Sequence, residues 1–173
     1  MQFRHLDERI ELRRQKLDSF SEGLSSIPGI KPPVTRPYVT RGAYYGYKPW
    51  YLAEELHGLS IDLYIRALQA EGVAIKRPGS APLHLSPLFS GVSGGIDSFT
   101  HSRPDSRRQY LPGDFPVSEH VHATSLSLPT FTYEPFSLIE EYLEAFEKVA
   151  RHAEELNTLE QKQGGWVTPD TRG

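Results

Sequence analysis

The string Ser93-Gly94-Gly95-Ile96-Asp97-Ser98 contains residue types that could bind a phosphate group. Glycines let backbone N–H groups approach an anion closely at the start of a helix. Such a loop needs a buried strand before it and a helix after it. Pro87 lies in the segment before the string and Pro104 follows within two turns, so neither flank fits. The segment 91–109 is therefore predicted to be a long surface loop, with phosphate binding as the alternative.

The same string is similar to the phosphate loop of ATP pyrophosphatases, which has the pattern Ser-Gly-Gly-x-Asp-Ser. This resemblance implies a nucleotide-binding function through residues 93–98. It depends on one short motif whose flanks do not fit, and it is kept as an alternative function.

The seven histidines include one close pair, His120 and His122. A zinc site needs further ligands, and no third ligand is well placed beside this pair. In a short helical segment the two side chains would also point to different faces. We therefore expect surface histidines here, and no metal site.

The composition argues against several classes of function. The chain has 173 residues, of which 38% are hydrophobic and 24% charged, and a net charge of −3 with scattered basic residues. This is ordinary for one globular domain, and it provides no broad basic surface for nucleic acid. Without cysteine, neither a disulfide framework nor a thiolate zinc site is possible. The charged N-terminus is unlike a signal peptide or a membrane anchor, so the cytoplasm is the expected compartment.

Apolar residues at spacings of three and four predict a first helix that the pair Pro28-Gly29 ends. Its seam is formed by Phe3, Leu6, Ile10, Leu17, Phe20 and Leu24. The other faces are assigned to Glu8, Arg9, Glu11, Arg14 and Lys16. One interpretation packs the seam on the rest of this domain. The other directs it toward a partner, because a small domain has limited surface to cover so long a seam.

The middle of the chain is predicted to contain short strands and one capped helix. After the extended, proline-rich segment 30–37, an aromatic strand is predicted over 43–51. Ser60 is placed as the cap of a helix that ends at Gly72, and a strand follows over 73–75. With fourteen prolines and fourteen glycines in the chain, a large regular sheet is not expected.

The last third of the chain is predicted to end in a second long helix. A helical turn opened by Ser118 precedes a short strand over 126–129. Ser137 and Glu140 have the spacing of a capping box, and the helix is expected to end near Leu159, before a flexible tail over 161–173. The predicted fold is α+β: a small three-stranded sheet with helices on one face and long helices at both ends.

The order of these elements resembles the C-terminal small domain of the DegT-type sugar and cyclitol aminotransferases, pyridoxal-phosphate enzymes of fold type I. The shared parts are the helix ending in Pro28-Gly29, the aromatic strand, and the strand that runs into a proline-rich loop with Leu83-His84. A Ser-Leu-Pro strand and a terminal helix complete the resemblance. Many members carry a histidine and an aromatic residue where this chain has Lys76-Arg77-Pro78, a departure closer to the branch that aminates inosose-type cyclitols.

The resemblance implies that a large domain carries the lysine and most of the groups that hold pyridoxal phosphate. None of the lysines here follows a strand in a polar cofactor-binding loop, so no catalytic residue is expected and the chain alone should not transaminate. By the same resemblance, the small domain closes over the substrate. Arg77 and His84 are the predicted substrate contacts. Tyr44, Tyr45 and Tyr47 are placed at the same pocket, with at least one of them expected in the core.

The sequence therefore predicts three parts: a partner-facing helix over 1–29, an aminotransferase small domain over 30–160, and the tail. The predicted function is that of a subunit or fragment of an aminotransferase for a keto sugar or keto cyclitol, active only with a large-domain partner in a hetero-oligomer. Because Met1 lies close to the start of the first helix, a separate subunit and a fragment of a longer enzyme both stay open. A non-catalytic partner that stabilises or regulates an aminotransferase is the second alternative.

Overall fold

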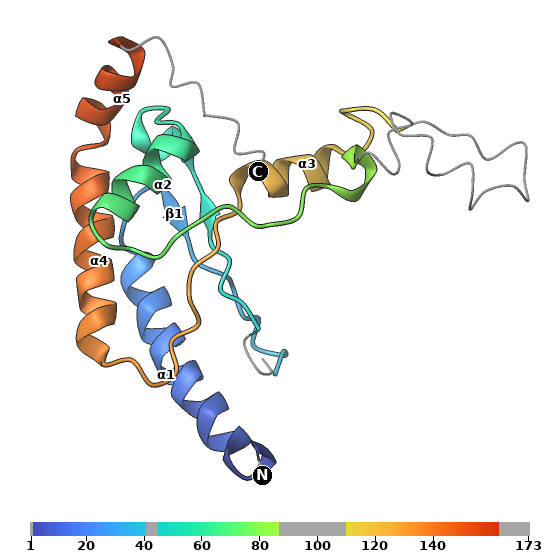
Figure 1. The fold of residues 1–173 in the computed structure, drawn as a ribbon, viewed down its shortest axis with the longest axis vertical. Coiled ribbons are helices and arrows are strands. Elements are labelled where there is room, and N and C mark those ends of the chain that lie inside the picture. The colour runs from blue at the N-terminus through green and yellow to red at the C-terminus, as the bar shows by residue number, and fades with distance from the viewer. Residues whose placement is uncertain (1, 41–44, 87–109, 163–173) are drawn as a thin grey trace, which may run out of the picture. The chain divides into compact units, whose positions relative to one another are not determined.

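The computed structural model describes residues 2–40, 45–86 and 110–162 (Figure 1). The fold is α+β, as predicted. The chain divides into two compact units. The main unit is Met1–Lys76 with Leu126–Gly173, and the inserted unit is Arg77–Ser125. The predicted loop 91–109, with its phosphate-loop string, and the tail beyond residue 162 lie outside the described residues.

The first helix is present and begins with a short 3-10 turn. This turn, η1, spans Gln2–His5, and α1 spans Leu6–Leu24. The chain then turns at Gly29, whose φ of 83° lies in the left-handed region that glycine adopts without strain. The turn at Gly29 agrees with the prediction, but the helix ends at Leu24, before the Pro28-Gly29 pair that was predicted to end it.

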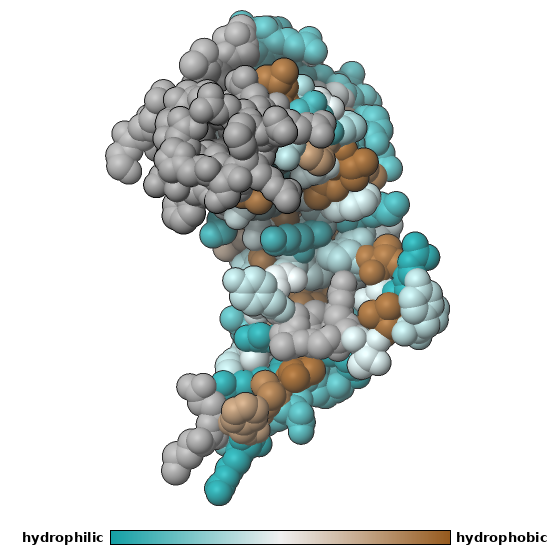
Figure 2. Space-filling view, turned by 90° about the vertical axis from the view of Figure 1, so that its right-hand side faces the viewer, coloured by the Kyte–Doolittle hydropathy of each residue, from teal (hydrophilic) through white to brown (hydrophobic). Residues whose placement is uncertain are grey.

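The apolar seam of α1 divides into a buried half and an exposed half. Leu17, Phe20 and Leu24 are fully buried in the core of the main unit. Phe3 and Leu6 are 88% and 40% exposed, and Figure 2 shows apolar atoms among polar ones at this end of the helix. The prediction that the whole seam faces a partner is therefore wrong for its C-terminal half, because this chain covers that half itself.

The second long helix is split in two and begins before its predicted cap. Helix α4 spans Phe136–Arg151 and α5 spans Ala153–Lys162, with His152 between them. The capping-box prediction at Ser137 is wrong: Pro135 occupies the N-cap position, and Ser137 lies inside the first turn. Proline restricts the residue before it and cannot donate a backbone hydrogen bond, so the helix starts directly after Pro135.

The core of the main unit is built around one phenylalanine of α1. The ring of Phe20 lies 5.5 Å from the rings of both Tyr47 and Phe131. It also contacts Phe146 and Tyr142 of α4, with ring centroids 6.1 and 6.3 Å away. Edge-to-face pairs of this kind add to the hydrophobic burial. Helices α1 and α4 consequently lie side by side, as Figure 1 shows.

Helix α2 spans Ile61–Ala70 and packs on α4. The predicted cap is confirmed: the Ser60 hydroxyl accepts a hydrogen bond from the Leu63 N–H at 3.2 Å. The same hydroxyl donates to the carboxylate of Glu160 on α5. Gly72 leaves the helix with a φ of 90°, as the sequence predicted.

The regular sheet is smaller than predicted. Two strands pair antiparallel, β1 over Ile30–Lys31 and β2 over Trp50–Tyr51. The predicted strand 126–129 makes only isolated bridges: Leu128 pairs with Tyr47, and Ser127 pairs with Lys76, which directly follows the predicted strand 73–75. The three predicted segments thus lie side by side, but a three-stranded sheet is not confirmed.

The backbone of segment 73–75 is occupied by other partners, which explains why no strand forms there. The Ile75 N–H donates to the Val73 carbonyl at 2.9 Å, a turn that a strand cannot contain. The Ala74 N–H donates to the Tyr142 hydroxyl at 3.0 Å, and the Ile75 carbonyl accepts from Gln69 at 2.8 Å. Three groups that a ladder would need are therefore already paired.

Lys16, which was assigned to a face outside the apolar seam, is buried. Its exposed fraction is 5%. The Nζ atom donates to the Thr132 carbonyl at 2.8 Å and to the Glu134 carbonyl. A buried ammonium needs such partners, and here the backbone of a loop supplies them.

Two arginines of α1 bind the same loop. Arg9 donates from Nε to the Tyr133 hydroxyl at 2.8 Å, and Arg13 donates from Nε to the Thr132 hydroxyl at 2.6 Å. Spacings of three and four place both arginines and Lys16 on one side of the helix. This basic face of α1 therefore fastens the loop before α4.

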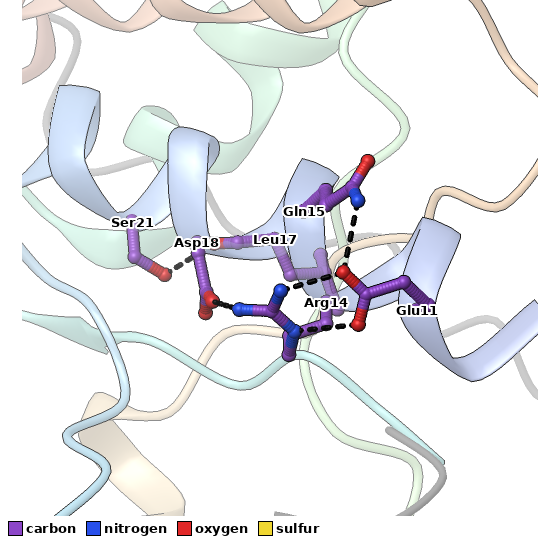
Figure 3. Close-up of polar contacts among 6 residues, drawn as sticks. All are labelled: Glu11, Arg14, Gln15, Leu17, Asp18 and Ser21. Carbon is purple, nitrogen blue, oxygen red and sulfur yellow. Dashed lines mark hydrogen bonds and ion pairs between the residues drawn. The ribbon is translucent and has the colours of Figure 1, made fainter. Parts of the chain in front are cut away.

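The solvent face of α1 carries an ion-pair network centred on Arg14 (Figure 3). Arg14 contacts both carboxylate oxygens of Glu11, at 2.8 and 2.6 Å, and reaches Asp18 at 3.4 Å. Gln15 donates a further hydrogen bond to Glu11 at 2.9 Å. Hydrogen bonds from Arg14 and then Gln15 lower the pKa of Glu11 to about 2. These contacts support the helix locally, and exposed pairs of this type contribute little to stability.

The inserted unit contains one short 3-10 turn and one helix among its described residues. The turn η3 spans Leu83–Leu85, and α3 spans Pro116–Thr124. The prediction that Ser118 opens this helix is wrong, because Pro116 occupies its first turn. Proline suits that position, since its missing N–H would have no partner within the helix. A further 3-10 turn, η2, spans Ala53–Leu56 in the main unit.

Candidate functional site

Two predicted site residues of the inserted unit contact the same helix. His84 Nε2 lies 2.9 Å from Glu119 Oε1, and Arg77 donates from Nη1 to the Ala123 carbonyl at 3.4 Å. Glu119 and Ala123 are four positions apart on α3, which places them on one face. Both side chains therefore have a contact on α3, and that of His84 is the shorter.

Glu119 is the centre of the polar network around His84. Its carboxylate accepts from the Gly113 N–H at 2.8 and 3.1 Å, in addition to the contact with His84. The hydrogen bond from the Gly113 backbone, followed by that from His84, lowers the pKa of Glu119. The carboxylate is consequently charged at neutral pH, and it orients the His84 ring.

A small pocket opens beside His84. Its volume is about 310 Å³. It is lined by Leu83, His84, Tyr110, Phe115 and Ser118. The His84 ring lies 4.8 Å from the Phe115 ring, which in turn lies 5.6 Å from the Tyr110 ring. Aromatic faces with one imidazole and the hydroxyl-bearing side chains of Tyr110 and Ser118 suit a small ligand that has an apolar face and hydroxyl groups.

Two of the three predicted tyrosines are described, and both belong to the main unit. Tyr45 belongs to the main unit, where it is exposed and lines a hollow of about 590 Å³ with Gln69 and Lys76. Tyr47 is 1% exposed, and its hydroxyl lies 2.7 Å from the Ser21 hydroxyl. Tyr47 is therefore the tyrosine of the core, which the sequence expected for at least one of the three. Tyr44 lies outside the described residues.

The sequence did not single out Glu119, which lies within hydrogen-bonding distance of His84, or Phe115, whose ring packs against the His84 ring. The signal available for Glu119 was an acidic residue in the first turn of a helix that starts with a proline. Its partner His84 is 35 positions away, and no local pattern links the two. Only the folded unit shows the pair.

Comparisons with solved structures give the fold a name. The aminotransferase TlmJ from Streptoalloteichus hindustanus matches 89% of this chain and 35% of its own, with a TM-score of 0.65 and 23% identity. DesV from S. venezuelae, solved in complex with a ketimine intermediate, matches 86% of this chain and 33% of its own, with a TM-score of 0.65 and 22% identity. A DegT DnrJ EryC1 StrS aminotransferase from Brucella abortus matches 86% of this chain and 33% of its own, with a TM-score of 0.62 and 22% identity.

This chain has the fold of a segment of the DegT-type aminotransferases. The predicted resemblance is confirmed at the level of the fold. The chain spans about a third of the length of the aminotransferase structures that it matches. Matches also include Spr1654 from Streptococcus pneumoniae in PLP and PMP forms, at TM-scores of 0.62 and 0.63. No protein-family model and no curated protein sequence matches the chain.

The six lysines of this chain do not fit a covalent site for pyridoxal phosphate. Lys16 is committed to two backbone carbonyls, and Lys148 pairs with Glu71 at 2.7 Å. The other four, Lys31, Lys48, Lys76 and Lys162, are exposed to solvent. A lysine that bonds to the cofactor needs an available amine in an enclosed site. Lys16 is enclosed, but its amine is already bound, and the other five lie at the surface.

The described part of the chain lacks two further features. No group of three or more histidine, aspartate or glutamate side chains could hold a metal ion there. Within the same ranges, none of the helices combines the length and the apolar character needed to cross a bilayer.

Proposed function

We propose that this chain is the small-domain part of a pyridoxal-phosphate aminotransferase that acts on a keto sugar or keto cyclitol. It works together with a large-domain partner, which carries the lysine and holds the cofactor. One observation supports this most strongly: the fold match covers 86–89% of this chain but only 33–35% of each aminotransferase. The remaining two thirds of those enzymes correspond to the large domain that we assign to the partner.

The proposed role of this chain is to close over the substrate. His84 and Arg77 are held on α3 by the contacts with Glu119 and Ala123, so their side chains start from fixed positions. The imidazole can exchange hydrogen bonds with a hydroxyl group, and the guanidinium can bind a carboxylate or a hydroxyl. Tyr45, fully exposed in the main unit, is the third proposed substrate contact. Tyr47 is left out of this set because its hydroxyl faces Ser21 in the core, whereas His84, although only 7% exposed, lines a pocket.

The exposed end of α1 is the proposed contact with the large domain. Phe3 and Leu6 are 88% and 40% exposed, although they continue the seam that packs the core further along. Apolar side chains in this position indicate an interaction surface. Replacement of Phe3 by serine should weaken assembly with the partner, whereas Leu159→Ser, at another exposed apolar position, should not.

Reconstitution tests the proposal directly. The full chain is mixed with a large-domain chain from a sugar aminotransferase that lacks its own matching segment. The expected result is a stable complex, cofactor absorbance that depends on the large domain, and transamination of a keto sugar or keto cyclitol. The mixture is compared with each component alone. If the two chains form no complex and no activity appears, the proposal fails.

Alanine variants distinguish this role from that of a purely stabilising partner. In the active complex, His84→Ala and Arg77→Ala should reduce turnover at low substrate concentration. A partner that only stabilises the large domain would tolerate both changes. A cytoplasmic location remains a prediction from the sequence.

A further inference from the structure

Three cations gather around an exposed tryptophan on the surface of the main unit. They line a hollow of about 470 Å³ that shares no lining residue with the pocket beside His84. The hollow is lined by Lys31, Pro32, Pro33, Val34, Arg36, Lys48 and Trp50. Within the described part of the chain, no carboxylate lines it, and none of its three cations forms an ion pair. Its positive charge is therefore unbalanced, although the whole chain has a net charge of −3.

The β1–β2 pair places one of these cations beside the indole. Lys31 and Trp50 are direct partners in the antiparallel register, so their side chains share one face of the pair. The other register pair, Ile30 and Tyr51, is buried in the core. Burial of that pair therefore turns the ammonium group and the aromatic ring outward together.

The outer face combines charge with apolar surface. From Tyr47 to Tyr51, buried and exposed residues alternate strictly, which leaves Lys48 on the same side as Trp50. Trp50 is 45% exposed and Val34 is 74% exposed. A ligand that satisfies this hollow must therefore present carboxylates or similar anions and also an apolar group.

The prolines decide how a polypeptide could bind here. Pro32 and Pro33 follow β1 directly, and they have fixed φ angles and no backbone N–H. This wall is stiff, and it cannot extend the β1 ladder to a further strand. Recognition at the hollow therefore depends on side chains and not on main-chain pairing.

The side chains of the hollow suit carboxylates around one apolar residue. A guanidinium binds a carboxylate with two parallel hydrogen bonds, and an ammonium adds a point charge. Tryptophan and arginine are also the residues that contribute most often to the energetic centre of protein interfaces. A nucleic acid strand fits less well, because its phosphates extend beyond three cations onto a chain of net negative charge.

We propose that this hollow is a docking site for a short acidic segment of a partner protein. Carboxylates of the segment pair with Lys31, Arg36 and Lys48, and an apolar side chain between them packs on Trp50 and Val34. The site goes beyond the proposed function, since it uses none of the residues assigned to the substrate or to the large domain.

Fluorescence anisotropy with a labelled peptide tests the site on the full chain. The probe is a short peptide in which glutamates flank one phenylalanine. We expect saturable binding that added salt weakens, because the cations are exposed. Two control peptides separate the parts of the interaction: one has glutamine for every glutamate, and the other has serine for the phenylalanine. Both should bind more weakly than the probe.

Variants of the chain locate the binding surface. Lys48→Ala and Arg36→Ala should each weaken binding by about threefold, the effect of one exposed ion pair. Lys48→Glu should weaken it further, because a repulsion replaces the attraction. Trp50→Leu should weaken binding by about tenfold, as expected for an aromatic anchor. Lys162→Ala, which removes an exposed charge elsewhere, should leave binding unchanged, and a thermal melt checks that each variant is folded.

Four outcomes would overturn the proposal. They are no saturable binding of the acidic peptide, equal binding of its glutamine version, and an effect of Lys162→Ala as large as that of Lys48→Ala. The fourth is tighter binding of a single-stranded oligonucleotide than of the peptide, which would assign the hollow to nucleic acid. None of these results affects the reconstitution experiment, so the two proposals fail separately.

Discussion

Lys16 Nζ donates a hydrogen bond to the Thr132 carbonyl at 2.8 Å, across 116 positions of the sequence. The contact joins α1 to the loop that leads into α4. It is one of two carbonyl contacts made by a side chain that is almost completely buried.

Replacement of Lys16 by methionine should destabilise the fold. The change retains most of the buried carbon chain but leaves the Thr132 and Glu134 carbonyls without their donor. A loss of about 2 to 4 kcal/mol in the free energy of unfolding is expected. Urea denaturation measures it, and Lys162→Met, at an exposed position, is the control. An unchanged midpoint would mean that the buried ammonium does not stabilise the fold.

Two glycines with positive φ should respond differently to alanine. A Cβ at Gly29 would overlap the Leu56 side chain, whereas a Cβ at Gly72 meets nothing within 4 Å. Gly72→Ala should therefore cost only the left-handed strain, about 1 kcal/mol, and Gly29→Ala about 3 kcal/mol because of the added overlap. Thermal and urea unfolding compare the pair. Equal losses would show that the Leu56 side chain moves aside at no cost.

Replacement of Tyr47 by phenylalanine separates a core role from a substrate role. The hydroxyl contact with Ser21 is lost, but the Ser21 hydroxyl still donates to the Leu17 carbonyl at 2.6 Å. The expected loss is about 1 kcal/mol of stability, with turnover of the reconstituted enzyme unchanged. A large drop in turnover at unaltered stability would return Tyr47 to the substrate set.

Glu119 should make the inserted unit sensitive to acid. Its folded-state pKa lies below the ordinary value of 4.5, because the Gly113 N–H and then His84 favour the charged form. The stabilisation is therefore complete above pH 4.5, and it is lost as the pH falls through the lowered pKa. A carboxyl NMR titration should show this pKa, and amide exchange at Gly113 should increase over the same window. Glu119→Gln should remove that step, and a titration at the ordinary value would contradict the network.

His84 should affect substrate affinity more than the chemical step. In the reconstituted enzyme, His84→Ala is expected to raise KM by about tenfold with a smaller change in kcat, the pattern of a lost binding contact. His152→Ala is the matched control, because it also removes an imidazole that pairs with a glutamate, His152 with Glu155 at 3.2 Å. A change in kcat alone would assign His84 another role.

The helices of this fold were predictable because their signals are local. The apolar spacing predicted α1 and α4, and the Ser60 cap with the Gly72 exit bounded α2 closely. The start of α4 was misplaced because Ser137 fits a capping pattern, whereas the helix already begins after Pro135, two residues earlier. Such local competition changes the ends of an element and not its existence.

The short strands and the partners of the site could not be predicted in this way. Segment 73–75 has the composition of a strand, but Gln69 and Tyr142 occupy its backbone from outside. A sequence pattern treats Lys16 as a polar residue and predicts no burial for it. Its burial is explained only by the contact with a loop 116 positions away. Arg77 and His84 came from a family resemblance, and their role in substrate binding stays a prediction. Their partners on α3 appear only in the folded unit.

The placement of Phe20 against Phe131 and Phe146 has a consequence for synthesis on the ribosome. The apolar side of α1 is made first, but its partners Phe131 and Phe146 are translated more than a hundred residues later. During that interval the nascent chain exposes a helix with an apolar surface that a chaperone can recognise. Folding of the main unit must wait for α4, and contacts of such long range make it slow.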